Sequence, residues 1–119
     1  MPKVIAIVDD LFFASKIRGT AEALSVPVSF PRTLESLIES ANSEPVGLII
    51  CDLNATRIDP VTLSKTLKAD DTLRSIPLIG FFSHVDTELQ RQAIDAGFDR
   101  VLPRSAFTAK LPQIMLGDV

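Results

Sequence analysis

Five short apolar runs alternate with segments whose apolar residues recur every three or four positions. A run of about five apolar residues is typical of a strand buried on both faces, and the intervening spacing is typical of amphipathic helices. Strands and helices that alternate in this way form successive βαβ units around a parallel sheet. We therefore expect one doubly wound α/β domain over residues 1–119. The expected strands are residues 3–8, 26–30, 46–51, 78–82 and 100–102.

Capping residues indicate where the expected helices begin. Thr33, Asp59 and Asp86 each stand before a helical apolar pattern, as N-cap residues do. The last helix is expected to be short and to begin near Thr108, because Pro112 is tolerated only near a first turn. The positions expected to face inward are Phe13, Ile17, Ala21 and Leu24, then Leu34, Leu37, Ile38 and Ala41, then Pro60, Leu63 and Leu67, and finally Leu89, Ala93 and Ile94.

Composition argues against several classes of function. The net charge is −3 and no two Lys or Arg residues are adjacent, which argues against direct nucleic-acid binding. No apolar run approaches the roughly 18 residues of a membrane span, and the N-terminus lacks a signal-peptide pattern, so we expect no membrane contact and a cytoplasmic location. The single Cys51 cannot form an internal disulfide, and its place in an apolar run predicts a small core residue.

Three carboxylates stand where two of the expected strands end. Asp9 and Asp10 follow the first apolar run, and Asp52 follows the third. The carboxyl ends of parallel strands meet at one edge of the sheet, where ligands bind in open α/β folds. Three carboxylates gathered there would repel one another unless a cation lay between them. The pattern therefore predicts a divalent metal site, and the alternative is that Asp9 and Asp10 only cap the following helix.

The sequence resembles the receiver domains of two-component response regulators over essentially its whole length. The motifs are VDD at residues 8–10, CDLN at residues 51–54, Pro77 before the fourth strand, and Ala96-Gly97 before the fifth. Each motif is weak alone, but their order and spacing resemble those of the family. The resemblance implies a flavodoxin-like (βα)5 fold with a parallel five-stranded sheet in the strand order 2-1-3-4-5.

The resemblance also implies a role in bacterial phosphorelay signalling. Asp52 would accept a phosphoryl group from a histidine kinase or a phosphotransfer protein. Mg²⁺ would be held by Asp9, Asp10 and Asp52, together with the backbone carbonyl of Asn54. The signal would pass to a downstream protein or an attached output domain, with homodimer formation as one route. Gain and loss of phosphate on Asp52 would be its only chemistry, so we do not expect an enzyme in the ordinary sense.

The sequence departs from the family where phosphorylation is sensed. Arg104 stands in the place of a Lys and keeps its charge but not its geometry. Phe82 stands where the family has its switch Thr or Ser, and the next residue, Ser83, would point the wrong way on a regular strand. Val101 replaces the aromatic residue of the switch. The chain therefore resembles an atypical receiver with a complete acid pocket and an altered switch region.

Two other functions stay open. One is a pseudo-receiver, which works as a protein-interaction module without phosphorylation; the combined loss of Lys, hydroxyl and aromatic residue suggests it. The other is a phosphohydrolase of the haloacid dehalogenase type, because Asp52, Asn54 and Thr56 loosely echo the DxDxT motif of that family. The second Asp of the motif is Asn here, and the motif follows the third strand rather than the first, so this alternative is the weakest.

Residues around the expected site have simpler interpretations as well. Arg104 is either a partner of the acid cluster or a solvated loop cation. His84 is expected to be a surface loop residue. Phe12 and Phe13 are expected to be one core residue and one lid over the site. An exposed helix face is expected for Glu88, Arg91, Gln92 and Asp95.

Overall fold

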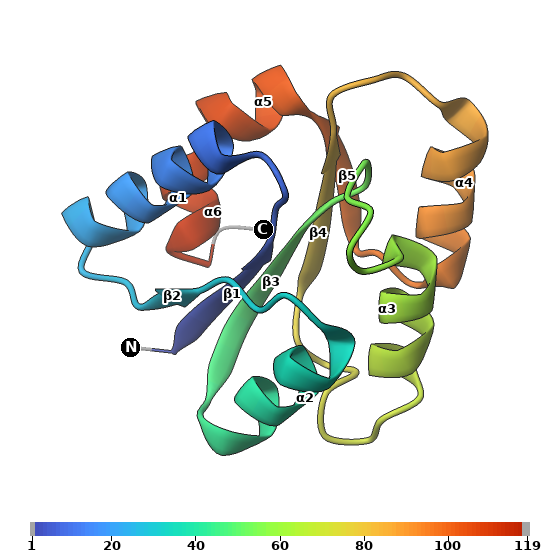
Figure 1. Cartoon of the computed structure of the whole chain (residues 1–119), viewed down its shortest axis with the longest axis horizontal. Helices are drawn as coiled ribbons and strands as arrows, with labels where there is room; N and C mark the ends of the chain where they lie inside the picture. The colour runs from blue at the N-terminus through green and yellow to red at the C-terminus, as the bar shows by residue number, and fades with distance from the viewer. Residues whose placement is uncertain (1, 118–119) are drawn as a thin grey trace.

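The computed structural model describes residues 2–117 and contains a five-stranded parallel sheet with helices on both faces (Figure 1). The strands are β1 (Lys3–Ile7), β2 (Val28–Ser29), β3 (Val46–Asp52), β4 (Leu78–Phe82) and β5 (Arg100–Pro103). They pair in the order β2-β1-β3-β4-β5, and every pairing is parallel. The predicted flavodoxin-like, doubly wound sheet with strand order 2-1-3-4-5 is therefore confirmed.

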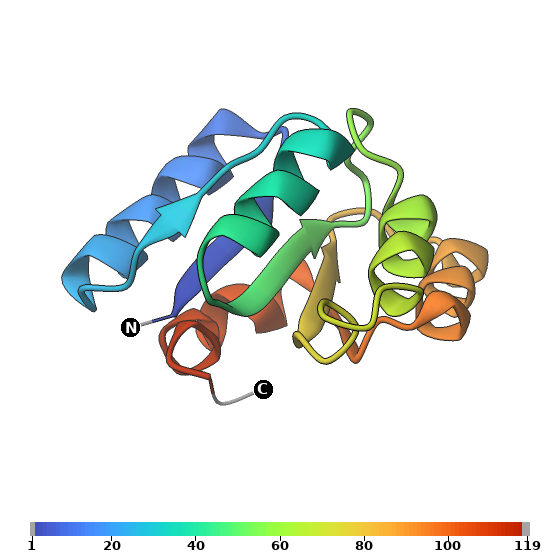
Figure 2. The ribbon, with the colours of Figure 1, turned by 90° about the horizontal axis from the view of Figure 1, so that it is seen from below.

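Helices cover the sheet in two groups. One face carries α1 (Leu11–Ala23), α5 (Arg104–Ala109) and α6 (Leu111–Met115), and the other carries α2 (Leu34–Ser43), α3 (Pro60–Lys68) and α4 (Thr87–Ala96) (Figure 1). Figure 2 shows α3 and α4 side by side at one end of the molecule. No helix within residues 2–117 is long and apolar enough to cross a membrane.

Each face of the sheet has its own apolar core. Ile5 of β1 lies in the core under α2, α3 and α4, which we call the α3 core, whereas its neighbour Val4 lies in the core under α1, α5 and α6, the α1 core. Three phenylalanine rings pack together in the α1 core. The ring centroids of Phe13 and Phe81 are 4.8 Å apart, and those of Phe81 and Phe107 are 4.7 Å apart. This phenylalanine cluster fixes the position of α1 on the sheet.

The predicted N-caps are confirmed. The side chains of Thr33, Asp59 and Asp86 each accept a hydrogen bond from the backbone N–H three residues further on. Gly97 ends α4 with a φ of 121°, a conformation that other residues rarely adopt. A Cβ at this glycine would also lie 2.7 Å from Cγ of Lys68. Local side-chain chemistry therefore sets the ends of these helices.

The predicted start of the last helix is wrong. The sequence predicts a helix that begins near Thr108, but α5 begins at Arg104, directly after β5. The chain makes two short helices in succession, and Pro112 lies in the first turn of the second, α6, where its missing N–H costs no hydrogen bond. Pro112 therefore does not exclude an earlier helix. The consequence for the site is that Arg104 is held in a helical first turn.

Helix α4 has a narrower inner face than predicted. Its only fully buried residue in the described structure is Ala93. Ile94, which the sequence predicts to face inward, is 50% exposed, so that prediction is wrong. A polar contact also joins α4 to α3. Ser64 interrupts the apolar stripe of α3, yet it is completely buried, and its Oγ donates to the carbonyl oxygen of Ala96 at 2.8 Å.

Cys51 occupies the interior of the sheet, as its apolar surroundings in the sequence predict. It lies in β3 with a free thiol and no exposed surface. Burial, and next the charge of Asp52, raises the pKa of this thiol. A neutral, enclosed thiol of this kind is a packing residue rather than a nucleophile.

Candidate functional site

The strand register brings several polar side chains to one edge of the sheet. Ile7 of β1 lies opposite Cys51 of β3, and Asp52 lies opposite Phe81 of β4. The residues that end or follow the strands are therefore neighbours at this edge. We call this group the strand-end site: Asp9 and Asp10 after β1, Asp52 at the end of β3, Ser83 after β4, and Arg104 after β5.

Asp52 is the only acidic side chain that the structure of residues 2–117 buries, with 8% of its surface exposed. One of its oxygens, Oδ1, accepts the backbone N–H of Asn54 at 2.9 Å. Burial raises the pKa of Asp52, and the charges of Asp9 and Asp10 raise it further. The Asn54 N–H and the charge of Arg104 oppose this effect. The carboxylate is thus enclosed and close to like charge, as is typical of functional acids.

Asp10 forms an ion pair with a residue 94 positions away in the sequence. Nη2 of Arg104 donates to Oδ2 of Asp10 at 3.1 Å. The other oxygen, Oδ1, caps α1 by accepting the backbone N–H groups of Phe12 at 2.9 Å and Phe13 at 3.2 Å. The Phe13 N–H, with Arg104 and the Phe12 N–H adding to it, holds the pKa of Asp10 below its ordinary value. Both oxygens of Asp10 therefore already have partners.

Arg104 makes two further contacts. Its guanidinium carbon lies 4.1 Å from the ring centroid of Phe13, a cation–π geometry. Its Nη1 donates to Oγ of Ser83 at 3.3 Å. The geometry agrees with the interpretation of Arg104 as a partner of the acid cluster rather than a solvated loop cation. Phe13 is thus a core residue that also supports the site, whereas Phe12, expected as a lid, is 91% exposed and covers nothing.

Two other side chains join the loops around the site. Oδ2 of Asp9 accepts the backbone N–H of Thr56 at 2.8 Å and its hydroxyl at 3.2 Å. Oδ1 of Asn54 accepts the backbone N–H groups of Ser83 at 2.9 Å and His84 at 3.4 Å. The sequence singled out Asn54 for its backbone carbonyl, so this role of its side chain was not predicted. His84 itself is an exposed loop residue, as expected.

The switch region combines two apolar side chains with one polar contact. Phe82 and Val101 are partly buried and pack against the α3 core. Ser83 reaches Arg104 because β4 ends at Phe82, so the following residue no longer obeys the alternation of a strand. The expectation that Ser83 points away from the site, which holds for a regular strand, is therefore wrong.

The oxygen atoms of the strand-end site suit a hard cation, but Arg104 already binds one of them, Oδ2 of Asp10. Carboxylate and carbonyl oxygens are the ligands that Mg²⁺ prefers. Within residues 2–117, however, no three Asp, Glu, His or Cys side chains lie close enough together to hold a metal ion. A divalent ion bound through Asp10 would have to displace Arg104. The ligand set Asp9, Asp10, Asp52 and Asn54 therefore stays a prediction.

A pocket of about 210 Å³ opens beside Asp9. Its lining includes Arg18, Arg32 and Arg57, together with the apolar side chains of Phe30 and other residues. The guanidinium carbon of Arg18 lies 4.7 Å from the centroid of the Phe30 ring. Within the described part of the chain, none of these three arginines forms an ion pair.

Comparison with known proteins gives a strong result in structure and none in sequence. No protein-family model and no curated protein matches the sequence. The chemotaxis response regulator CheY4 of Vibrio cholerae matches with a TM-score of 0.82 at 15% identity, over 100% of this chain and 99% of that chain. The receiver domain of the sensor histidine kinase PA1611 from Pseudomonas aeruginosa, with magnesium in its active-site cleft, matches with a TM-score of 0.80 at 17% identity, over 96% and 93% of the two chains. The chain has the fold of response-regulator receiver domains.

A third solved structure is more similar in sequence than these two, although its identity is still low. The phosphorylated cyanobacterial phytochrome response regulator RcpA matches with a TM-score of 0.71 at 25% identity, over 99% of this chain and 91% of that chain. The resemblance to receiver domains read from VDD, CDLN and Ala96-Gly97 is therefore confirmed in structure. The roles of individual site residues stay predictions.

Proposed function

We propose that this chain is a receiver module of a phosphorelay and that Asp52 is its phosphoryl acceptor. The observation that supports this most directly is the position of Asp52, a buried carboxylate at the end of the central strand β3. Arg104 supplies positive charge at the same edge. A carboxylate attacks phosphorus when it is held in position and when nearby cations neutralise the transferred charge.

The proposed donor is a phosphohistidine on a histidine kinase or phosphotransfer protein. An oxygen of Asp52 attacks the phosphorus, and the P–N bond breaks. The bonding electron pair goes to the imidazole nitrogen, which takes up a proton from solvent, and an acyl phosphate forms on Asp52. The signal then passes to a downstream protein or an attached output domain in the cytoplasm. No turnover is proposed beyond gain and loss of this phosphoryl group.

Mg²⁺ is the proposed cofactor. Asp9, Asp10, Asp52 and the backbone carbonyl of Asn54 would hold it. When bound, Mg²⁺ neutralises charge on the transferred phosphoryl group. The magnesium in the cleft of the PA1611 receiver supports this assignment. In this chain the assignment also requires Asp10 to exchange its ion pair with Arg104 for the metal.

Phosphorylation by a small phosphodonor tests the proposal. The full chain is incubated with phosphoramidate and Mg²⁺, and its intact mass is measured by mass spectrometry. We expect the mass of one added phosphoryl group on the wild type and on Asp71→Asn, which changes an exposed acid elsewhere. We expect none on Asp52→Asn. A wild type that stays unmodified, or a gain that persists in Asp52→Asn, would contradict the proposal.

A second candidate is the phosphorylation-independent pseudo-receiver. The observation in its favour is that Arg104 already occupies Asp10 while Phe82 and Val101 contribute apolar side chains to the switch region. Binding of an output partner that Asp52→Ala leaves unchanged, with or without phosphodonor, would support this function. Binding that depends on Asp52 would count against it.

The haloacid dehalogenase-type phosphohydrolase gains no structural support. At the place of the second acid of that motif, Asn54 uses its amide oxygen to bind the backbone of Ser83 and His84. An amide cannot donate the proton that this acid supplies. Turnover of a generic phosphate ester is the result that would revive this alternative.

A further inference from the structure

Arg104 is the only cation that pairs with an acid of the strand-end site in the described part of the chain. It also touches the segments that follow three different strands. It lies at the start of α5, it binds Asp10 at the start of α1, and it binds Ser83 after β4. One side chain therefore joins the acids to the loop between β4 and α4.

The guanidinium is held in a defined orientation. Its central carbon lies over the ring of Phe13, which is 4% exposed and belongs to the phenylalanine cluster. The N–H groups of a guanidinium lie in its plane and form a rigid fork of donors. One edge meets Asp10 and another meets Ser83. A Lys ammonium is a compact charge without this fork and could not reproduce the arrangement.

Arg104 and a divalent ion require the same carboxylate. Oδ1 of Asp10 caps α1, so Oδ2 is the oxygen that a metal would take, and Arg104 occupies it. Two positive groups a few ångströms apart also repel each other. Binding of the metal at Asp10 therefore requires Arg104 to move away.

We propose that Arg104 is a resident cation of the strand-end site and that it competes with Mg²⁺ for Asp10. The exchange reaches the β4–α4 loop through the contact of Arg104 with Ser83. This proposal rests on the proposed function in one respect, the position of the Mg²⁺ site. When Mg²⁺ binds, Arg104 leaves Oδ2 of Asp10 and gives up its bond to Ser83, while Asn54 continues to hold the Ser83 backbone. Metal binding at the strand-end site thus affects the switch region without a hydroxyl at position 82 or an aromatic ring at position 101.

Divalent-metal affinity is the first test. Mg²⁺ binding to the full chain is measured by isothermal titration calorimetry for the wild type, Arg104→Gln and Arg57→Gln. Arg57 is a matched control, because it lines the pocket beside Asp9 but forms no ion pair within the described residues. We expect Arg104→Gln to bind Mg²⁺ about fivefold more tightly than the wild type, as loss of a partly buried ion pair predicts. Arg57→Gln should change the affinity by less than about twofold.

The second test follows Arg104 directly. In a ¹⁵N NMR titration of the wild type with Mg²⁺, the Arg104 Nε–Hε signal should lose the ring-current shift that Phe13 imposes. The amide signal of Ser83 should move in parallel with it. In Ser83→Ala, Mg²⁺ should still release Arg104, and the affinity should stay within about twofold of the wild type. Circular dichroism establishes that each variant folds. If Arg104→Gln is unfolded, Arg104→Lys, which keeps the charge but lacks the fork, serves as the second variant. Arg104→Lys should also bind Mg²⁺ more tightly than the wild type.

Several outcomes would overturn the inference. They are weaker or unchanged Mg²⁺ binding in the Arg104 variants, equal tightening by Arg57→Gln, no Mg²⁺ binding in any variant, or Mg²⁺ binding that leaves the Arg104 signal in place. Failure of the proposed function looks different. An Asp52 that is never phosphorylated, in a chain whose Arg104 yields to Mg²⁺, would contradict the phosphorelay role and leave the competition established.

Discussion

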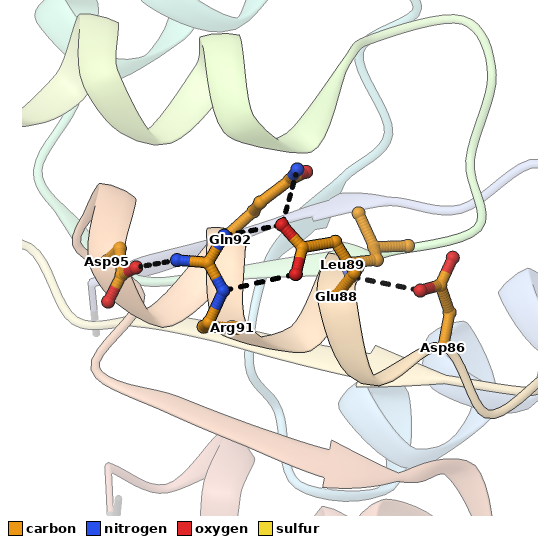
Figure 3. A network of polar contacts seen from close by, with 6 residues as sticks. All are labelled: Asp86, Glu88, Leu89, Arg91, Gln92 and Asp95. Atoms are coloured by element: carbon orange, nitrogen blue, oxygen red, sulfur yellow. Dashed lines mark hydrogen bonds and ion pairs between the residues drawn. The ribbon is translucent and has the colours of Figure 1, made fainter.

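Two arginines of this molecule bind acids in contrasting surroundings. Arg91 lies on α4 between Glu88 and Asp95, and its Nη1 donates to Asp95 at 2.7 Å while its other nitrogens bind Glu88 (Figure 3). All three side chains are at least 60% exposed. Arg104 binds Asp10 across 94 residues of sequence, and the two side chains are 35% and 39% exposed. The α4 network thus has more hydrogen bonds, and the strand-end pair is better enclosed.

The two networks show that the number of polar contacts is a poor guide to their importance. Residues three and four apart on a helix meet wherever the helix forms, and exposed pairs of this kind stabilise it only slightly. The pair of Asp10 and Arg104 exists only when β1 and β5 lie in one sheet with their ends aligned. It also rests on the ring of Phe13, which belongs to the α1 core. Changes at the strand-end site should therefore act on both stability and function.

The largest expected effect is that of Phe13→Ala. The substitution leaves a cavity in the phenylalanine cluster and removes the ring under Arg104, so we expect a loss of about 3–5 kcal/mol in the free energy of unfolding. Urea unfolding followed by circular dichroism measures it, since the chain has no Trp or Tyr for fluorescence. The neighbouring Phe12→Ala is the control, because Phe12 is 91% exposed and should change the stability by less than about 0.5 kcal/mol. Equal losses in the two variants would show that Phe13 is not the support described.

A smaller effect is expected for Asp10→Ala, with Asp86→Ala as its counterpart on α4. Both residues cap a helix, but Asp10 accepts two backbone N–H groups and also pairs with Arg104, whereas Asp86 accepts one N–H group. We expect Asp10→Ala to lower the Tm by about 5 °C and Asp86→Ala to lower it by about half as much. Thermal unfolding followed by circular dichroism measures both. Equal shifts would mean that the Arg104 pair adds nothing to the cap.

The same comparison shows what could be predicted from the sequence. The strands, the N-caps at Thr33, Asp59 and Asp86, and the exposed α4 face follow from spacing and local side-chain chemistry, which the chain carries with it. The gathering of acids at one sheet edge follows from the topology of parallel strands. The sequence therefore predicts which residues approach the site.

The contacts inside the site could not be predicted in the same way. The bond from Arg104 to Asp10 and the ring of Phe13 beneath it depend on how the loops after β1 and β5 direct their side chains. The wrong prediction for the start of the last helix has a related cause. Pro112 limits only the helix that contains it, and the sequence does not reveal that the chain forms two short helices, α5 and α6, instead of one.

The pH dependence of stability should distinguish Asp52 from Asp10. Burial raises the pKa of Asp52, so the contribution of this carboxyl group to stability falls as the pH rises from the ordinary carboxyl pKa through the raised one. Asp52→Asn lacks this loss and keeps an acceptor for the Asn54 N–H, so it should be more stable than the wild type at neutral pH, with the gain vanishing in acid. The gain should be smaller than the loss in Asp10→Ala, because Arg104 already offsets part of the burial.

Urea unfolding of the wild type and Asp52→Asn over a series of pH values checks this prediction. Asp10 should show the opposite sign. Its pKa lies below the ordinary value, so its contribution to stability is present above that value and is lost as the pH falls through the lowered pKa. An Asp52→Asn variant that is no more stable than the wild type at neutral pH would contradict the idea that the fold holds Asp52 at a cost.

The smallest effect is expected for Arg91→Gln in the α4 network. Arg91 bridges Glu88 and Asp95, but all three side chains are at least 60% exposed, so water and salt screen their attraction. Glu88 also lies in the first turn of α4, where the helix dipole favours a negative charge without any partner. We expect the Tm to fall by no more than about 1 °C at low ionic strength, and the difference from the wild type to disappear in high salt. A larger, salt-independent loss would mean that Arg91 holds α4 against the rest of the fold, since exposed charges cannot do so through screened attraction alone.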